Sequence, residues 1–474
     1  MAFWNRRTSI DALNNLDDRH RLKRTLRWPH LVALGVGAIV GTGIYTLIGI
    51  GAGRAGPAVI LAFVIAGAVC ACAALCYAEL ATLMPAAGSA YTYTYAVGGE
   101  LLAWIVGWSL ILEYSVVCSA VAVGWSGYAV GFLDSIGLHL PVWLTAGPHA
   151  GGIVNLPAVV ILFAVAGLLM LGTRESATVN AFLVVFKVLA LLVFIVIAAK
   201  AFNGSHFTPF MPFGFGAHTD GTEVRGVMAA AAIIFFAFYG FDAVSTAAEE
   251  TIDPKRDLAR GIIGSMIVCT LLYMGVAAAA LGAMRYEEFS ASPEPLAFIL
   301  RTLGSPLAAT LIAAAAVIAL PTVILAFMYG QSRIFFVMAR DGLLPHRLGS
   351  INAHRGTPVA MILVTAIVTS LIGGIFPLAE IAELANAGTL CAFIAVAACV
   401  LALRVREPAR PRVFTTPWPW VVAPFAIAGC VYLFVSLPPA TRTRFFIWNA
   451  LGLVVYLLYA RFSSVLAKRV YQRA

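Results

Sequence analysis

The chain has 474 residues, of which 61% are hydrophobic and 11% are charged, and its mean hydropathy is +0.92. Soluble domains are about half apolar and about a quarter charged, so this composition excludes a soluble globular protein and predicts an all-α polytopic membrane protein. The formal net charge is +9. Topology accounts for that charge, as shown below, so we expect a lipid bilayer and no nucleic acid as partner.

Membrane-spanning helices need about 20 mainly apolar residues. Twelve segments of the sequence meet this requirement: 30–52, 58–83, 99–132, 154–173, 178–202, 226–249, 261–284, 306–338, 357–376, 379–405, 418–437 and 442–462. The third and the eighth are too long to stand upright in a bilayer and should be tilted or protrude from it.

The distribution of Lys and Arg predicts the orientation. With the N-terminus in the cytoplasm, 23 of the 31 basic residues fall on the cytoplasmic side and 7 on the other, and one lies inside a helix. An even number of spans places both tails, 1–29 and 463–474, in the cytoplasm. We therefore expect a multi-pass protein of the cell inner membrane.

The first span contains three glycines within seven residues, at Gly37, Gly41 and Gly43. Glycine is a poor helix former. Gly37 and Gly41 alone would fit close helix packing, in which small residues four apart form the contact. Because Gly43 follows at once, we instead predict that the helix is broken here.

The sixth span carries a matching irregularity, with Gly240 and Asp242 in an apolar context. Because five spans separate the two breaks, the sixth helix crosses the membrane in the opposite direction to the first. Broken helices at corresponding positions of two inverted halves indicate the central site of a secondary transporter. The predicted repeats are 30–202 (helices 1–5) and 226–405 (helices 6–10), with helices 11 and 12 at 418–462 appended.

A break in a membrane helix leaves backbone groups without partners, so a ligand or another side chain must satisfy them. The half-helix that begins near Gly43 presents N–H groups that suit an anion. The half-helix that ends near Ile39 and Val40 presents carbonyl groups that suit a cation. Together the two breaks are suited to the carboxylate and ammonium groups of an amino acid.

Lys187 lies in the fifth span, roughly 13 Å from its cytoplasmic end at 1.5 Å per residue. A lysine at the centre of a membrane helix costs roughly 2.5–3.5 kcal/mol, and snorkelling from this depth would be incomplete. Carbonyl groups of the first break lie at a similar depth and could accept its hydrogen bonds. Burial favours the neutral amine and nearby carbonyl dipoles favour the ammonium. We therefore predict that Lys187 couples transport to protons rather than to sodium.

Intramembrane acids are further candidates. Glu113 could bond to a neighbouring helix, act as a second proton site or read a basic substrate. Asp242 is expected to bond to exposed backbone of the second break. Glu79, Glu249 and Glu250 lie near cytoplasmic ends, where they could belong to a gate with Lys255 and Arg256 or form ordinary ion pairs.

The eight cysteines all lie in apolar segments and the eight histidines in tails, loops or helix ends. This distribution is typical of small buried thiols rather than of disulfides or metal ligands. The spans contain no His-rich, Ser-His-Asp-like or metal-ligand cluster. We therefore expect no catalytic residues, no metal and no cofactor, and a protein that is not an enzyme.

Five segments of the sequence, in order, resemble the cationic amino acid transporter family of the amino acid–polyamine–organocation superfamily: GVGAIVGTGIY, YAELATLMPAAGSAYTY, FFAFYGFDAVSTAAEE, DPKRDLARGI and YGQSRIFFVMARDGLLP. The resemblance covers helices 1–10. It implies the leucine-transporter fold of twelve transmembrane helices, with a 5+5 inverted repeat and two C-terminal helices, and transport by alternating access.

The resemblance also implies functional residues. It assigns substrate contacts on the first helix to Ile39, Thr42 and Gly43, next to Gly41 of the break. On the sixth helix it assigns Phe236, Ala237 and Tyr239, with Phe238 as an aromatic gate. It places the proton-linked lysine at Lys187.

Phe327 and Met328 on the eighth helix are expected to line the distal side of the pocket. Both are bulky and apolar, so we expect small or medium neutral L-amino acids, such as alanine, to enter the cell in symport with protons. A cationic substrate (arginine, lysine or ornithine) and an exchange mechanism remain alternatives. A channel, a membrane-embedded enzyme and a sensor fit the sequence less well, and a small single-helix membrane subunit is a candidate partner.

Overall fold

The computed structural model describes residues 6–7, 10, 26–85, 88–170, 177–220, 223–248, 251–345, 348 and 359–471. The longer helices of this part of the chain are α2 (Trp28–Ile39), α4 (Leu47–Ala55), α5 (Val59–Leu83), α6 (Ser89–Val97), α7 (Glu100–Ser135), α9 (Leu156–Met170), α10 (Ala177–Ala199), α11 (Val227–Ile234), α13 (Pro254–Ala283), α15 (Pro295–Thr302), α16 (Pro306–Arg340), α17 (Val359–Ile375), α18 (Leu378–Arg406), α19 (Pro419–Val435), α20 (Pro439–Val455) and α22 (Val465–Tyr471). The short ones are α3 (Thr42–Tyr45), α8 (Val142–Thr145), α12 (Asp242–Thr246), α14 (Tyr286–Phe289) and α21 (Arg461–Ser463).

Every predicted span coincides with one or more of these helices. Eight helical stretches of the described chain are long and apolar enough to cross a membrane, and four shorter apolar helices accompany them, namely α2, α9, α17 and α19. The molecule is thus a helical, polytopic membrane protein. A small departure from the all-α prediction is an antiparallel hairpin between α10 and α11, formed by β1 (His218–Asp220) and β2 (Glu223–Arg225).

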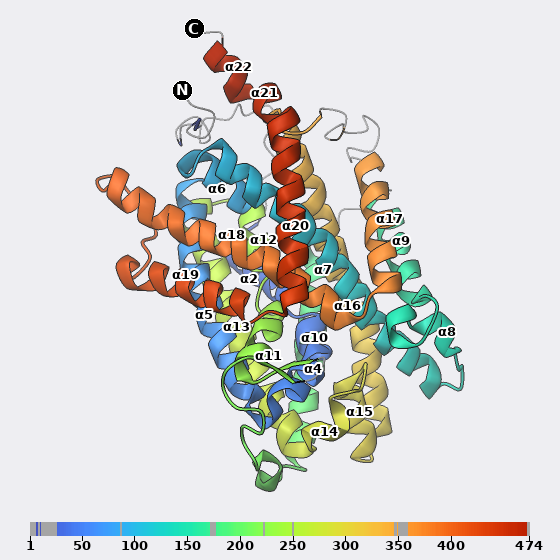
Figure 1. Ribbon diagram of the computed structural model, residues 1–474. Coiled ribbons are helices and arrows are strands. Elements are labelled where there is room, and N and C mark those ends of the chain that lie inside the picture. Colours follow the sequence, from blue (N-terminus) through green and yellow to red (C-terminus); the bar gives the residue numbers. More distant parts are fainter. Residues whose placement is uncertain are drawn as a thin grey trace.

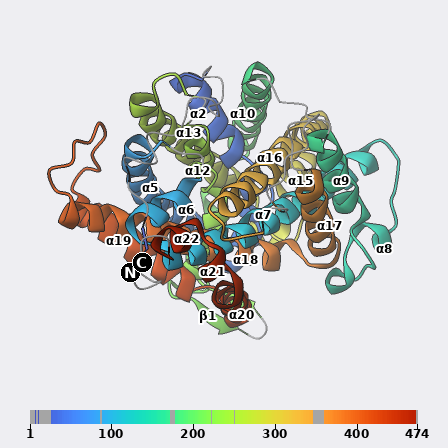
Figure 2. The ribbon, with the colours of Figure 1, turned by 90° about the horizontal axis from the view of Figure 1, so that it is seen from above.

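Long helices cross at the centre of the molecule (Figure 1). α7 packs along α16 and against α18, and α5 packs against α13. Seen from above, α2, α10 and α13 gather at one edge, while α9 and α17 lie side by side at another (Figure 2). This arrangement surrounds the broken helices with unbroken ones, which supply partners for the backbone groups that a break leaves free.

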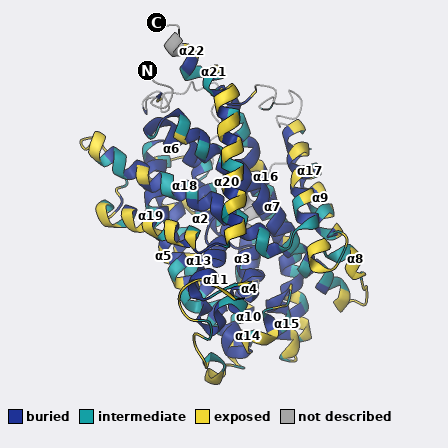
Figure 3. Ribbon diagram, viewed as in Figure 1, coloured by how far each residue is buried: buried dark blue, intermediate teal, exposed yellow. Residues whose placement is uncertain are grey.

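Burial follows this arrangement. In the apolar window within Val227–Thr246, the stretch that contains the second predicted break, 94% of the residues are buried, whereas only 28% of Phe182–Ala199 and 22% of the apolar window within Pro439–Ser463 are buried. Exposed residues are concentrated on outer helices such as α19 and α20, and the interior is formed by buried segments (Figure 3). The exposed side chains of α10 and α20 are largely apolar, for example Phe182, Leu189 and Leu451. This is the pattern of helices that face lipid.

The first described residues and the last helices of the described chain lie on one face of the molecule. Arg6 donates a hydrogen bond to the carbonyl oxygen of Arg461 at 2.9 Å, and the backbone N–H of Glu100 donates to the carbonyl of Arg6. α6, α21 and α22 lie on this face, whereas α14 and α15 lie at the opposite end (Figure 1). We call these the terminal face and the distal face. Arg6 and Arg461 therefore lie on the same side, as the predicted even number of spans requires.

Candidate functional site

The first predicted break is present. α2 ends at Ile39, Val40 and Gly41 are not helical, and α3 begins at Thr42. The half-helix that follows is shorter than expected, because Thr46 interrupts it again before α4 begins at Leu47. The break lies at the predicted place, and the half-helix that follows it is interrupted a second time at Thr46.

The second break is also present. α11 ends at Ile234, a single 3-10 turn covers Phe235–Ala237, and α12 begins at Asp242. Gly240 has a φ of +113°, a backbone conformation that residues other than glycine rarely adopt. Its N–H donates to Oδ1 of Asp242 at 3.1 Å, which confirms that Asp242 bonds to backbone exposed by the break. Oδ2 of Asp242 accepts from the hydroxyl of Tyr114 on α7 at 3.0 Å.

Glycines allow the two breaks to touch. A Cβ atom on Gly43 would lie 2.3 Å from Cα of Ala237, and one on Gly240 would lie 3.0 Å from the carbonyl carbon and oxygen of Ala38. Real Cβ atoms essentially never approach backbone to 2.3 Å, and 3.0 Å is closer than nine in ten real Cβ contacts. The unwound parts of the first and sixth spans therefore meet near the centre of the molecule, as the inverted arrangement predicts.

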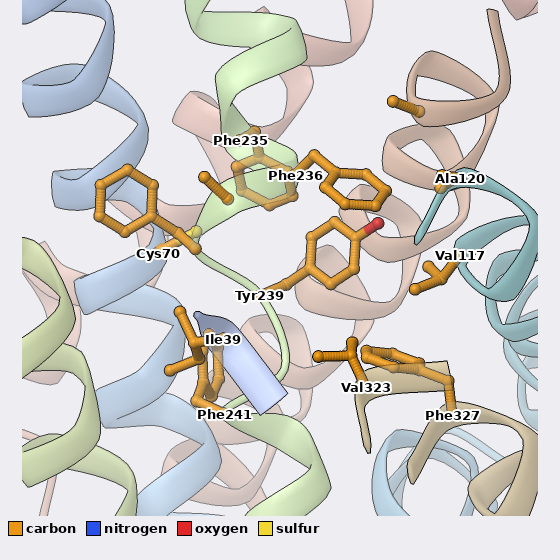
Figure 4. Close-up of a cluster of buried hydrophobic side chains, with 14 of the residues drawn as sticks. Ile39, Cys70, Val117, Ala120, Phe235, Phe236, Tyr239, Phe241, Val323 and Phe327 are labelled. Atoms are coloured by element: carbon orange, nitrogen blue, oxygen red, sulfur yellow. The ribbon is translucent and has the colours of Figure 1, made fainter. Parts of the chain in front are cut away.

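A cavity lies where the breaks meet. Its lining comes from both breaks and from α7 and α16: Ala38, Ile39, Gly41, Thr42, Gly43, Val117, Val121, Phe236, Tyr239, Val323 and Phe327. Figure 4 shows Phe236 and Tyr239 facing Val117 on one side and Val323 and Phe327 on another. None of the lining side chains is charged. The space has room for about one water molecule, so an amino acid can enter only if the surrounding helices move apart.

Lys187 reaches the first break. Its Nζ lies 3.0 Å from the carbonyl oxygen of Gly37 and 3.1 Å from the hydroxyl oxygen of Thr322 on α16, and the side chain is completely buried. The expected contact between this amine and a carbonyl of the broken helix is confirmed. A second carbonyl of the same turn, that of Ile39, accepts from the hydroxyl of Tyr273 on α13 at 2.8 Å. Side chains of neighbouring helices therefore satisfy the freed end of α2.

The predicted site residues separate into two groups. Ile39, Gly41, Thr42, Gly43, Phe236, Tyr239 and Phe327 all line the cavity. Ala237, Phe238 and Met328 do not. Ala237 lies at the contact between the two breaks, Phe238 packs edge-on against the rings of Phe63 and Tyr273, and Met328 is buried on α16 next to Phe327.

Sequence reasoning missed four lining residues, Ala38, Val117, Val121 and Val323. The only sequence signal is their spacing, because Val117 and Val121, like Val323 and Phe327, are four residues apart and share one face of a helix. Apolar pairs with this spacing occur throughout the spans, so the signal does not distinguish a cavity wall from ordinary packing.

Glu113 is buried on α7, one turn from Val117. Neither of its carboxylate oxygens has a hydrogen-bond partner among the described residues, so the bond to a neighbouring helix is not found there. Thr389 of α18 is close by, but its hydroxyl donates to the carbonyl of Ala385. A buried ionised carboxylate without partners is unfavourable, which makes Glu113 the least satisfied acid of this region.

Glu79 forms part of an ion-pair cluster near the terminal face. Its carboxylate lies 2.7 Å from Arg404 and 3.0 Å from Arg412, and it accepts from the N–H of Thr416. The partners are thus arginines of α18 and the loop after it, and not Lys255 or Arg256 as considered from the sequence. Glu249 and Glu250 lie outside the described residues.

Within the described part of the chain, no group of three His, Cys, Asp or Glu residues is placed to hold a metal ion. The eight cysteines are free thiols, most of them buried. The site therefore offers backbone dipoles, hydroxyls, one amine and apolar walls, which can bind and enclose a small molecule.

Comparisons with known proteins agree with this geometry. The family model described as "Amino acid permease" matches residues 26–459. The branched-chain amino acid permease BcaP of Bacillus subtilis (strain 168) is 44% identical over 466 residues, which cover 97% of this chain and 98% of that protein. The methylthioribose transporter of the same organism is 39% identical over 466 residues (98% and 99%). Cationic amino acid transporter 4, vacuolar, of Arabidopsis thaliana is 36% identical over 413 residues (85% and 67%).

Proposed function

This chain belongs to the amino acid permease family, and on that premise we propose that it carries neutral L-amino acids with apolar side chains, from alanine to the branched-chain amino acids, into the cell in symport with protons. Membership makes it a membrane transporter of the amino acid–polyamine–organocation superfamily and not an enzyme. The observation that carries the finer proposal is the meeting of two helix breaks at a cavity whose lining has no charged side chain.

The backbone of the breaks supplies the groups that would bind the amino and carboxyl groups of the substrate. The backbone N–H groups of Thr42 and Gly43 lie at the start of α3, where no preceding turn of that helix supplies acceptors. Carbonyl groups end α2 on the other side of the break. In our proposal the carboxylate binds at the N–H groups and the ammonium at the carbonyl groups, as the dipoles of both half-helices favour.

The side-chain part of the cavity supports a neutral substrate. Val117, Val121, Val323 and Phe327 present only hydrocarbon, and a cationic side chain placed against them would lose its hydration without gaining a counter-charge. The name of the relative BcaP specifies branched-chain amino acids, whose side chains suit such walls. Met328 remains a prediction for the distal side of the specificity pocket, as does Phe238 or a neighbour for the gate.

Proton coupling is assigned to Lys187. As an ammonium ion it holds the carbonyl of Gly37 and thus fixes the end of α2. Loss of the proton would weaken this bond, because a charged donor binds a carbonyl more strongly than a neutral amine does. In the proposed cycle, protonation of Lys187 favours one position of α2 and deprotonation releases it, which couples proton movement to alternating access.

Glu113 is proposed as a second proton site. It is buried among α7, α12 and α18 without a partner for its carboxylate among the described residues, so it would carry a proton in this conformation. Its position one turn from Val117 is close enough to the cavity for substrate binding to alter its surroundings.

The inverted 5+5 repeat, the twelve spans with both ends in the cytoplasm, and the location in the inner membrane form part of the same proposal. The meeting of Arg6 with Arg461 on the terminal face supports the shared side of the two ends. The single-helix subunit stays a prediction on which no contact of the described residues bears.

Uptake into proteoliposomes tests the proposal. Purified protein should accumulate radiolabelled valine, leucine or alanine when the outside is more acidic than the inside, and a sodium gradient should not replace the proton gradient. Accumulation driven only by sodium would contradict the role of Lys187. Preference for arginine or lysine would favour the cationic alternative, and counterflow that is indifferent to the pH gradient would favour an exchanger.

A further inference from the structure

Asn386 of α18 makes two hydrogen bonds to the end of the second broken helix. Its Nδ2 donates to the carbonyl oxygen of Ala232 at 2.7 Å and to that of Ile233 at 3.2 Å, and the residue is completely buried. These carbonyls belong to the last turn of α11, immediately before the chain tightens into the 3-10 turn and unwinds. Asn386 does not line the cavity, so it can affect the site only through the backbone that it holds.

The bonds of Asn386 correspond to those of Lys187. Lys187 lies in the fifth predicted span and donates to a carbonyl in the last turn of α2, before the first break. Asn386 lies in the tenth and does the same for the sixth. The packing agrees with this correspondence, because α10 packs against α2 and α18 packs against α11. The two residues therefore have equivalent places in the two proposed repeats, but different chemistry.

The difference in chemistry has a consequence for the two breaks. An amine can lose a proton and with it most of its strength as a donor, whereas the amide of asparagine keeps its two N–H donors at every physiological pH. We propose that Asn386 is the positioning residue of the second break, a permanent cap that keeps α11 in its substrate-binding shape while the corresponding cap of the first break, Lys187, is released by deprotonation. This inference rests on the proposed transport function.

Further contacts of α18 support a fixed second half. Three residues before Asn386, Glu383 lies 2.5 Å from Arg54 at the end of α4 and accepts from the hydroxyl of Thr441. The carbonyl of Arg54 in turn accepts from the N–H of Gly226, at the start of α11. The distal half-helices α4 and α11 are thus tied to α18 and to each other, and Asn386 holds the end of α11 that adjoins the cavity.

Two variants of Asn386 separate a positioning role from simple packing. Asn386→Leu has a similar volume and no donor. Asn386→Asp is isosteric and can donate a hydrogen bond only when its carboxyl group is protonated. Cys399→Ala, a buried change on the same helix more than three turns away, is the matched control.

Counterflow of the best substrate, measured at a series of pH values equal on both sides, gives the first readout. Asn386→Leu should raise KM about tenfold at every pH, because a tenfold smaller fraction of molecules has the binding-competent break. Asn386→Asp should have nearly the wild-type KM at acidic pH, and its KM should rise towards that of the Leu variant as the carboxyl group ionises. Cys399→Ala should match the wild type. A KM for Asn386→Leu within twofold of the wild type, or equal values for Leu and Asp at every pH, would overturn the inference.

Other titratable groups near Asn386 do not account for a difference between the pH profiles of the variants. Among the described residues, the titratable or charged groups outside α18 that contact it are Arg54, Tyr77, Glu79, Tyr93, Glu113, Arg412 and Arg444. Helix α11 carries no titratable side chain. All variants retain these groups, so a pH dependence confined to Asn386→Asp comes from the new carboxyl group.

Hydrogen–deuterium exchange of the full-length protein gives a readout that needs no substrate. Asn386→Leu should speed exchange in the segment 232–240 and leave that of 37–45 unchanged. Unchanged exchange in 232–240 would refute the positioning role even if transport were impaired. If exchange rises as expected but the wild type transports no amino acid, the positioning role stands and the proposed function fails.

Discussion

Gly43 of the first broken helix lies directly against Ala237 of the second, so closely that a Cβ atom on Gly43 would lie 2.3 Å from Cα and 2.6 Å from Cβ of Ala237. Two helices that are distant in sequence thus approach each other backbone to backbone at the point where both are unwound. This contact brings the polar groups of both breaks to one cavity, and it explains why a side chain at position 43 would not fit.

The contact predicts the effect of Gly43→Ala. Because the added methyl group meets backbone, the two breaks must separate, and we expect kcat/KM for uptake to fall by about a hundredfold, the scale of a 1 Å displacement of a binding group. Gly41→Ala is the comparison, because its methyl group would make only ordinary van der Waals contacts, at 3.4 Å from the side chain of Val323 and 4.0 Å from the carbonyl oxygen of Ile39. Proteoliposome uptake should show a much smaller loss for Gly41→Ala. Equal losses would contradict the proposed contact between the breaks.

Substitution of Lys187 should separate coupling from binding. Lys187→Gln retains a donor near the carbonyl of Gly37 but cannot release a proton, so counterflow should persist while accumulation driven by a pH gradient is lost. Lys187→Met removes the donor as well and should reduce counterflow about tenfold or more, because a buried carbonyl loses its partner. Wild-type uptake should increase as the external pH falls. Proton-driven accumulation by Lys187→Gln would exclude Lys187 as the coupling residue.

Glu113→Gln tests the second proton site. The amide has the shape of the protonated acid but cannot give up a proton. Substrate binding, measured as a thermal shift, should therefore be kept while net uptake falls about a hundredfold or more, the range typical for loss of a proton-transfer group. Glu113→Asp should retain pH-dependent uptake at a lower rate. Wild-type uptake by Glu113→Gln would mean that this residue has only a packing role.

Phe327 and Met328 offer a matched pair for specificity. Only Phe327 lines the cavity, so Phe327→Ser should enlarge it and raise the preference for phenylalanine or methionine over valine about tenfold, the effect of one or two methylene groups in an apolar pocket. Met328→Ser should change this ratio much less. Competition uptake with the unlabelled amino acids measures both. A larger change for Met328→Ser would show that the substrate side chain lies against the Met328 face of α16 and not against Phe327.

The ion pair of Arg54 and Glu383 should show strong coupling in thermal unfolding. Both side chains are largely buried, with 14% and 5% of their surfaces exposed. Removal of one partner leaves a buried unpaired charge, which costs about 3–5 kcal/mol. Arg54→Met and Glu383→Met should each lower the melting temperature in detergent, and the double variant should lose less than the two single variants together. Additive losses would show that the pair is not coupled.

Much of the fold could be predicted because a bilayer restricts a chain so strongly. Each of the twelve apolar segments coincides with helical structure, since a membrane admits few alternatives to a helix. The breaks were predictable for the same reason, because Gly43 added to Gly37 and Gly41, and a glycine near an intramembrane aspartate at Gly240-x-Asp242, weaken a helix beyond what close packing explains. The contact of Lys187 with α2 could be predicted from depth alone, since an amine in the membrane must find an acceptor.

The partners of individual side chains depended on tertiary structure. Glu79 binds Arg404 and Arg412 rather than Lys255 or Arg256 at the start of α13. Asn386 could not be singled out from the sequence, because α18 has an ordinary composition. The cavity walls on α7 and α16 could not be predicted from the sequence either. Val117, Val121 and Val323 differ from their apolar neighbours only in the direction that they face.

The amino-acid sequence by itself determined that this protein is helical, lies in a membrane and breaks two of its helices, because hydropathy and glycine spacing act locally along the chain. Only the tertiary structure decided which groups meet at the breaks, because the packing of α10 and α13 against α2, and of α18 against α11, sets which side chain reaches which carbonyl. In the sequence, Lys187 and Asn386 are unconnected single residues. Their correspondence appears only in the packed structure, where each donates a hydrogen bond to the end of a broken helix.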